Sequence, residues 1–189
     1  MKPYKKTPDD IARAIRRRDH EAFKKAFEMW FEKMTLFGEY FLYAREEAED
    51  VAQEVFVELW ENADKLPEIA NLQGYLFTEV KNKCLNRLKH LRVEDNYKRW
   101  LAEAQEYAEI PDTEIDEEQV RQVYAAIEEL PEQARHIFKQ CALEGKKYKE
   151  VAAELGVSVN TVNTQMSRSF KYIREKLGIT LLLFIYHIM

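Results

Sequence analysis

The sequence predicts an all-α protein made of two small helical domains that are joined by an acidic linker. Glycine and proline are scarce, at 5 each in 189 residues, and charged residues reach 33%. Apolar residues recur at helical spacing over most of the chain. Residues 93–116, between two such regions, are acidic and lack a continuous apolar stripe. These three observations favour helices with few tight turns and a division of the chain near its middle.

Charge is distributed unevenly along the chain. Residues 1–92 hold 17 Lys and Arg against 17 Asp and Glu, residues 93–130 hold 3 against 12, and residues 131–189 hold 9 against 5. The net charge of −5 therefore hides an acidic middle and a mildly basic C-terminal region. An overall acidic balance does not exclude nucleic acid as a partner of that last region.

The N-terminal region contains patterns of three helices before the first loop. The run Thr7-Pro8-Asp9-Asp10 has a cap, a proline at the first helical position and acids in the first turn, so it predicts a helix that ends near Asp19. A second helix has an aromatic-rich face that we interpret as core: Phe23, Phe27, Trp30, Phe31 and Met34. A third runs from about residue 45 to 62, with a buried face of Ala48, Val51, Ala52, Val55, Phe56 and Leu59.

The other side of this third helix is acidic. It carries Glu47, Asp50, Glu54, Glu58 and Glu61. Such a stripe is either a solvated face or a surface for a basic partner.

A fourth helix is predicted over residues 72–91, after a loop at 64–71 that contains Pro67. Its second half has five basic residues and no acid: Lys81, Lys83, Arg87, Lys89 and Arg92. Tyr75 and Phe77 lie one to two turns upstream. Basic residues near aromatics and a loop suit single-stranded nucleic acid, although basic helix ends also complement the helix dipole.

The second domain is predicted to start near Glu117 and contains a helix-turn-helix pattern over residues 148–173. Val151, Ala152 and Leu155 give the first helix an apolar face, Gly156 ends it, and Ser158 can cap the next helix. Val162, Met166, Phe170, Ile173 and Leu177 form the second apolar stripe. An amphipathic hairpin of any helical bundle would share the stripes, but the combined spacing of Ala, Gly and apolar positions is typical of DNA binding.

The remaining features exclude several classes of function. The four histidines have no metal-ligand spacing, no Gly-rich phosphate loop exists, and no Ser/His/Asp set is apparent, so we expect no catalytic residues, no metal and no cofactor. Cys84 and Cys141 are expected to be buried, reduced thiols. The N-terminus lacks an apolar signal core, which predicts a cytoplasmic protein.

The chain ends in an apolar run, residues 179–189. This run is about half the ~20 residues that span a bilayer. We therefore expect it to pack on a neighbouring element or to form a contact surface, without direct membrane insertion.

Three segments together resemble the region 2 and region 4 signatures of extracytoplasmic-function (ECF) sigma factors, the small two-domain group of the sigma-70 family. They are AEDVAQEVFVELWE (48–61), LQGYLFTEVKNKCLNRL (72–88) and IEELPEQARHIFKQCALEGKKYKEVAAELGVSVNTV (127–162). Within the group, the chain looks most like the iron-citrate-regulator type common in Bacteroidetes. The run D-x-x-Q-E at residues 50–54 and L-P-x-x-x-R at residues 130–135 carry most of the specificity.

The resemblance implies a domain plan and partners. Residues 1–92 would be region 2, which binds core polymerase and the −10 element. Residues 93–116 would be the linker, and residues 117–178 would be region 4, which binds the −35 element and the β flap. Residues 179–189 would be an apolar tail. The implied partners are core RNA polymerase, promoter DNA and an anti-sigma factor. The implied function is promoter recognition, DNA melting and transcription initiation.

The resemblance also assigns roles to individual residues. The polymerase β′ clamp helices would be bound by Asp50, Gln53, Glu54 and Glu58. The −10 DNA would be contacted by Lys65, Asn71, Tyr75, Lys81, Asn82, Asn86, Arg87 and Lys89. The −35 DNA would be contacted by Lys146, Lys147, Ser158, Asn160, Thr161, Asn163, Thr164, Arg168 and Lys171.

The recognition helix departs from the family pattern at Asn163 and Gln165, where related helices often carry Lys or Arg. Asn and Gln can read adenine but release no counterions. We therefore hypothesise weak autonomous −35 binding and dependence on polymerase or on an additional DNA-targeting partner. The alternative function is a free-standing helix-turn-helix transcriptional regulator, which would bind duplex DNA without polymerase.

Overall fold

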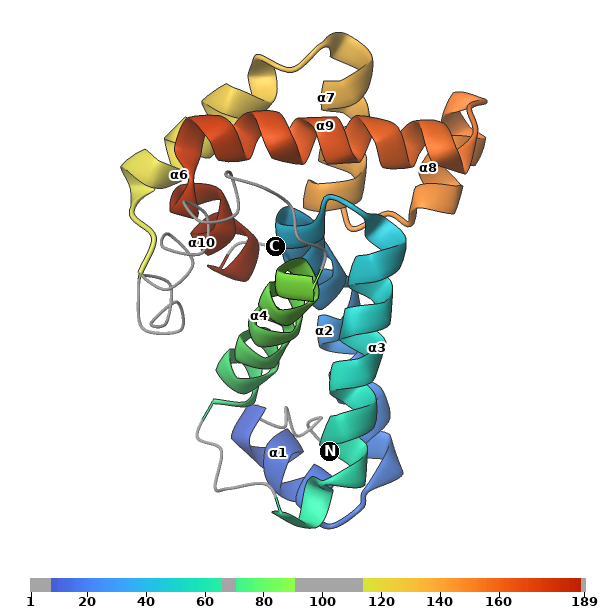
Figure 1. The fold of residues 1–189 in the computed structure, drawn as a ribbon, viewed down its shortest axis with the longest axis vertical. Helices are drawn as coiled ribbons and strands as arrows, with labels where there is room; N and C mark the ends of the chain where they lie inside the picture. Colours follow the sequence, from blue (N-terminus) through green and yellow to red (C-terminus); the bar gives the residue numbers. More distant parts are fainter. Residues whose placement is uncertain (1–7, 66–70, 91–113, 188–189) are drawn as a thin grey trace, which may run out of the picture.

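The computed structural model describes residues 8–65, 71–90 and 114–187, and within these ranges every regular element is a helix. The first group comprises α1 (Pro8–Arg16), α2 (His20–Leu42), α3 (Arg45–Glu61), the short 3₁₀ turn Ala63–Lys65 and α4 (Leu72–His90). The second comprises α6 (Glu117–Glu128), α7 (Glu132–Phe138) with the π-helical turn Lys139–Leu143, α8 (Tyr148–Leu155) and α9 (Val159–Leu177). A final helix, α10 (Ile179–His187), lies between the two groups (Figure 1). The all-α prediction is confirmed.

The first domain is a bundle built around α2, which packs against α1, α3 and α4. Its core is rich in aromatics, as the Phe37 ring packs at 4.9 Å from the Phe77 ring of α4. Helices α2 and α3 approach closely at Gly38, where an added Cβ would stand 3.2 Å from the Cβ of Ala48. The approach explains why a residue without a side chain occupies this position.

The first two helices meet at a different residue from the one the sequence predicts. Helix α1 ends at Arg16, and Asp19 is the N-cap of α2, where its carboxylate accepts from the amides of Glu21 and Ala22. The prediction that the first helix extends to about Asp19 was therefore wrong by one turn. The reason is the capping role of Asp19, which requires extended backbone.

The second domain holds the helix-turn-helix, whose register is confirmed. Gly156 ends α8 with a left-handed backbone (φ 64°), and the Ser158 hydroxyl accepts from the Thr161 amide at the start of α9. Val162, Met166, Phe170 and Ile173 are all fully buried. Helix α6 begins with a capping box formed by Asp116 and Gln119.

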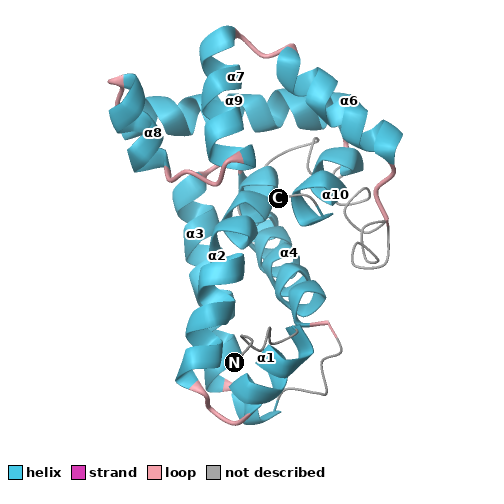
Figure 2. Ribbon diagram, turned by 180° about the vertical axis from the view of Figure 1, so that it is seen from behind, coloured by secondary structure: helices cyan, strands magenta, loops and turns pink. Residues whose placement is uncertain are grey.

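The apolar C-terminal run packs inside the protein, as one of its two predicted outcomes stated. Residues 180–186 of α10 are all buried, and the helix contacts α2, α6 and α9. Figure 2 shows from behind that α10 lies beneath α6 and α9 and beside the upper part of α4. No helix among the described residues is long and apolar enough to cross a membrane.

Candidate polymerase and promoter interface

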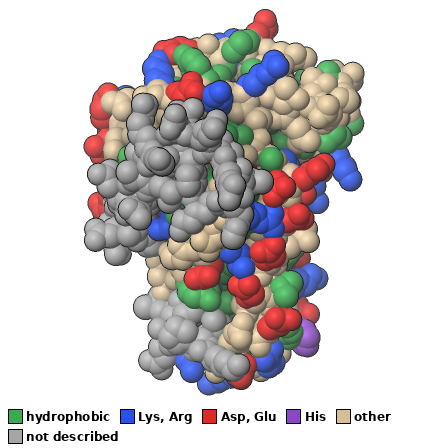
Figure 3. All heavy atoms as spheres, in the orientation of Figure 1, with side chains coloured by type: hydrophobic (Ala, Val, Ile, Leu, Met, Phe, Trp, Pro, Cys, Tyr) green, Lys and Arg blue, Asp and Glu red, His purple; other side chains and the backbone are tan. Residues whose placement is uncertain are grey.

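One ridge of α3 points away from the core and carries two of the predicted polymerase-binding residues, Asp50 and Gln53. Its inward face, from Ala48 to Leu59, is buried, so helical geometry turns Asp50, Gln53 and Val57 outward, and all three are exposed. Asp50 and Gln53 form no ion pair or side-chain hydrogen bond with another described residue. The polar side chains of Asp50 and Gln53 are therefore available to a binding partner. Figure 3 shows acidic side chains gathered over this part of the surface.

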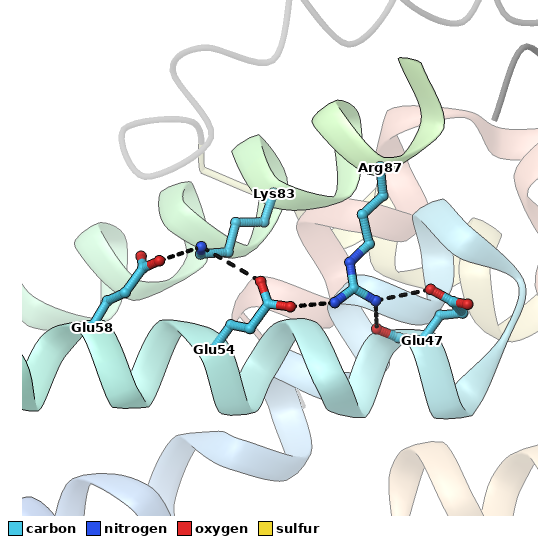
Figure 4. A network of polar contacts seen from close by, with 5 residues as sticks. All are labelled: Glu47, Glu54, Glu58, Lys83 and Arg87. Carbon is cyan, nitrogen blue, oxygen red and sulfur yellow. Dashed lines mark hydrogen bonds and ion pairs between the residues drawn. The ribbon is translucent and has the colours of Figure 1, made fainter. Parts of the chain in front are cut away.

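The predicted polymerase-binding and −10-binding residues partly bind one another. Lys83 Nζ of α4 lies 2.6 Å from Glu58 Oε1 and 3.5 Å from Glu54 Oε2. Arg87 pairs with Glu54 and, at 2.8 Å, with Glu47 Oε2. Figure 4 shows this ladder of three acids on α3 and two bases on α4. It was not anticipated, because the acidic stripe and the basic helix end were assigned to separate partners.

The ladder raises the pKa of both of its basic groups. Burial disfavours the charged form of Lys83, but hydrogen bonds and charges from Glu58 and Glu54 outweigh it and raise the pKa of the ammonium. The same balance, with Glu54 and Glu47 as partners, raises the pKa of Arg87. A nucleic acid that binds Lys83 or Arg87, or a polymerase surface that binds the acids of α3, must therefore replace the ion pairs of the ladder.

The other predicted −10 residues are placed variously along α4. Asn71 caps the helix, since its Oδ1 accepts from the Gly74 amide at 2.9 Å. Tyr75 is half-buried, whereas Asn82 and Asn86 are exposed. Lys81 is only 6% exposed, and burial lowers the pKa of its ammonium. The side chains of Lys65 and Lys89 lie outside the described residues.

Burial of Lys81 limits what it can do in this conformation. A side chain that is mostly covered is poorly placed to reach a phosphate without a rearrangement of its neighbours. Asn82 and Asn86, by contrast, lie one turn apart on an open face of α4. The exposed amides are the better placed members of the predicted set.

The recognition helix α9 presents two different sides beyond its buried stripe. Asn160, Thr164, Arg168 and Lys171 are exposed and share one face at helical spacing. On the adjoining side, Ser167 donates at 2.7 Å to the carbonyl of Tyr43, the C-cap of α2. Asn163 is half-buried, and its Oδ1 has no hydrogen-bond partner among the described residues. Six of the nine predicted −35 residues are exposed, whereas Lys146, Thr161 and Asn163 are only partly exposed.

Local contacts occupy some of the predicted −35 residues. Ser158 serves as the helix cap, and the Thr164 hydroxyl donates to the Asn160 carbonyl at 2.8 Å. Lys146 Nζ lies 2.7 Å from Glu154 Oε2. Thr161 is half-exposed, while Lys147, Arg168 and Lys171 are exposed. The last three are basic side chains open to phosphate.

A polar cluster that sequence reasoning missed joins the two domains. The Tyr148 hydroxyl donates to the buried Glu39 carboxylate, and the Arg45 guanidinium lies 4.3 Å from the centre of the Tyr148 ring. Arg45 also pairs with Glu32 at 2.6 Å and with Glu49 at 2.8 Å. A glutamate inside the apolar stripe of α2 was the available signal, but nothing in the sequence pairs it with a tyrosine 109 positions later.

Metal chemistry finds no support in the described ranges, where no group of three or more His, Cys, Asp or Glu side chains is arranged to hold an ion. The two cysteines there are free and buried. Burial raises the pKa of the Cys141 thiol to about 12 and that of Cys84 further. Both thiols are therefore poor nucleophiles.

Family models match both domains. The model "Sigma-70 region 2" matches residues 38–93, and "Sigma-70, region 4" matches residues 120–173. Together they cover more than half of the chain, in the order in which the domains occur. The residues that they match include the α3 ridge, the whole α3–α4 ladder and the helix-turn-helix.

Two curated relatives share 25% identity with this chain. The ECF RNA polymerase sigma factor SigE of Mycolicibacterium smegmatis aligns over 70% of this chain and 52% of its own length. The ECF RNA polymerase sigma factor RpoE of Cereibacter sphaeroides aligns over 89% of this chain and 93% of its own. The chain thus spans about half the length of the first relative and nearly all of the second.

Two solved structures are also similar. One is CnrH in complex with the cytosolic domain of CnrY, at 19% identity and a TM-score of 0.41, covering 90% of this chain and 96% of that one. The other is the sigma factor RpoE in complex with the anti-sigma factor NepR from Bartonella quintana, at 17% identity and a TM-score of 0.35, covering 84% and 98%. The finer assignment to an iron-citrate-regulator type stays a prediction. On its two matched regions and its named relatives, the chain belongs to the sigma-70 family, in the extracytoplasmic-function group of sigma factors.

Proposed function

We propose that this protein binds core RNA polymerase and directs it to promoters whose −10 and −35 elements it reads with its first and second domains. The observation that carries the proposal is the presence, in one chain, of an exposed polar ridge on α3 and an open recognition face on α9, each inside a matched sigma region. The relatives are named RNA polymerase sigma factors. We infer that the α3 ridge binds a polymerase surface and that the open face of α9 binds duplex DNA.

The polymerase contact is proposed to centre on Asp50 and Gln53. Both are exposed on the α3 ridge, and the Asp50 carboxylate suits a basic partner surface. Glu54 and Glu58 were predicted to share this role, but each pairs with α4 in the free protein. Their contribution to polymerase binding would need a competing cation to displace Lys83 or Arg87.

The DNA contacts are proposed to differ between the domains. On α4, Asn82 and Asn86 are placed to meet unpaired bases of the −10 strand, with Arg87 available once it leaves the ladder. On α9, Asn160, Thr164 and Arg168 would enter the major groove, while Lys171 of the same helix and Lys147 at the start of α8 would hold phosphate. The open face of α9 carries a single arginine, Arg168, and this supports the hypothesis of weak −35 binding.

The test is specific initiation. Purified protein would be added to core RNA polymerase with a promoter pool, and transcript starts would be mapped. We expect starts at a defined position downstream of shared −10 and −35 sequences. Duplex binding without polymerase and without specific starts would instead establish the free-standing regulator.

A variant pair makes the polymerase contact testable. Asp50→Ala with Gln53→Ala should lower the affinity for core polymerase, because it removes only exposed side chains of the ridge. The matched control is Glu28→Ala, an exposed acid on α2 of the same domain that forms only a 4.0 Å pair with Lys24. Equal core affinity in the double variant and the control would contradict the assignment.

A further inference from the structure

Helix α10 differs from every other described helix in being apolar on all sides. Its sequence is ITLLLFIYH, and residues 181–185 are at most 1% exposed. A helix of this kind is stable only when neighbours cover its whole circumference. Which elements provide the cover therefore determines what the helix holds together.

The cover comes from both domains. On the side of the second domain, the Tyr124 ring of α6 packs edge-on against Phe184 at 5.6 Å. On the side of the first, the Phe77 ring of α4 packs edge-on against Tyr186 at 5.1 Å, and Gln73 donates to the Tyr186 carbonyl at 3.2 Å. Separation of the domains would expose one of these two faces to water.

The base of α10 is fixed to the first domain as well. The Tyr40 hydroxyl donates to the carbonyl of Gly178, the residue that links α9 to α10, at 3.1 Å. One turn earlier on α9, Arg174 donates to the Tyr40 carbonyl at 3.2 Å and to the Tyr43 hydroxyl at 2.9 Å. The end of the recognition helix and the start of α10 are thus held against the same end of α2.

This arrangement places the two proposed DNA-contacting helices close together. Helix α10 contacts α9 on one side and the Gln73–Phe77 turn of α4 on the other. Where α10 contacts them, the two helices are two helix-to-helix spacings apart, about 20 Å, and the ~1.5 Å rise per residue from there to Asn160 on α9 and to Asn86 on α4 adds about 45 Å at most. Elements named for positions −10 and −35 are about 25 base pairs apart, which is roughly 85 Å along a duplex. The closed form cannot reach both elements at once.

We propose that α10, residues 179–187 of this chain, binds both domains at once and latches the sigma factor in a closed form that must open for promoter binding. The latch itself depends only on contacts in the free protein, whereas its consequence for promoters rests on the proposed function. The closed form also explains why Ser167 of the recognition helix bonds to the Tyr43 carbonyl at the end of α2.

The test measures the distance between domains in the full chain. Donor and acceptor dyes would be attached at Lys25→Cys on α2 and Gln133→Cys on α7, both exposed positions. The native Cys84 and Cys141 are buried, with raised thiol pKa values, and should not react. The latch variant is Tyr186→Ser, which removes the ring that packs on Phe77. The matched control is Tyr172→Ser, since Tyr172 is 40% exposed and bonds to Glu129 within the second domain.

We expect the latch variant to raise the open-to-closed ratio by about two- to tenfold, the effect of losing one aromatic pair, with unchanged helical content. The control should match the parent. Equal energy transfer in the parent, the control and Tyr186→Ser would overturn the latch.

Initiation assays on the same variants separate the two proposals. With the parent active, Tyr186→Ser should reach half-maximal initiation at a severalfold lower concentration. An opened variant with unchanged half-saturation would overturn the claim that the latch opposes promoter binding. Opening in Tyr186→Ser, combined with no initiation by any version, would leave the latch standing and remove the sigma function.

Discussion

The Tyr148 hydroxyl of α8 donates a 2.6 Å hydrogen bond to Oε2 of Glu39 on α2, across the boundary between the two domains. Glu39 is completely buried, and its other oxygen has no partner among the described residues. Burial raises the pKa of this carboxyl to about 7, although the Tyr148 hydrogen bond and the Arg45 charge act in the opposite direction. A group that titrates near neutral pH therefore lies at the contact that holds the domains together.

The first prediction is that domain closure weakens as the pH rises. Because the pKa of Glu39 in the closed form exceeds its ordinary 4.5, closure favours the protonated carboxyl, and the stabilisation is lost as the pH rises through about 7. The groups that face Glu39 are Tyr148 of α8, Arg45 and Glu49 of α3, Glu32 of α2, and Cys141. Energy transfer between the dye positions should fall from pH 5.5 to pH 8.

Glu39→Gln provides the control for this prediction. The amide keeps the shape and can still accept from Tyr148, but it does not ionise. Its energy transfer should stay nearly level over the same pH range. A slope as steep as that of the parent would assign the pH dependence to another group.

The second prediction concerns the ladder between α3 and α4. Its acids are about half exposed and its bases are a fifth to a quarter exposed, so each pair should contribute about 0.2–1 kcal/mol to folding. A double-mutant cycle with Arg87→Gln and Glu54→Gln, measured by urea unfolding, should give a coupling energy in that range. A value several times larger would show that the ladder is mainly a structural support.

The third prediction is that the turn of the helix-turn-helix depends on Gly156. Its φ of 64° is left-handed, and an added Cβ would meet nothing within 4 Å, so the cost of a side chain is one of backbone conformation alone. Gly156→Ala should lower the free energy of unfolding by about 1–2 kcal/mol. Gly156→Asn should cost less, because asparagine adopts this conformation more readily. Equal losses in urea unfolding would contradict this explanation.

Local signals in the sequence predicted the helices better than the contacts between them. Gly156, Ser158 and the stripe from Val162 to Ile173 act within a few residues of each other, and the helix-turn-helix was therefore predicted in register. The Tyr148–Glu39 bond joins residues 109 positions apart, and the Lys83–Glu58 pair joins residues 25 apart. Periodicity shows which face of a helix is apolar, but it does not identify the surface that the face meets.

The residues of the candidate site also fall into two groups: those whose exposure could be predicted from local sequence and those whose exposure could not. That Asp50 and Arg168 are exposed follows from the helical register alone. The burial of Lys81 and the partial burial of Asn163 depend on contacts with residues distant in the sequence, which a pattern of residue types does not show. The sequence of the apolar tail says least about its contacts, because its seven buried residues could pack against any apolar surface.

The last prediction tests the hypothesis that the protein alone binds −35 DNA weakly. Gln165 of α9 is half-exposed and lies next to Thr164 and Arg168 of the open face. Gln165→Lys should add one phosphate contact and steepen the slope of log affinity against log salt by about 0.9. The duplex would carry the −35 sequence found by mapping starts, and binding would be followed by fluorescence anisotropy. Gln133→Lys on α7 adds the same charge at an exposed position of the same domain, so it controls for net charge. If both variants steepen the slope equally, α9 does not lie along the phosphates. If neither does, residue 165 lies away from DNA, and the glutamine there does not account for weak −35 binding.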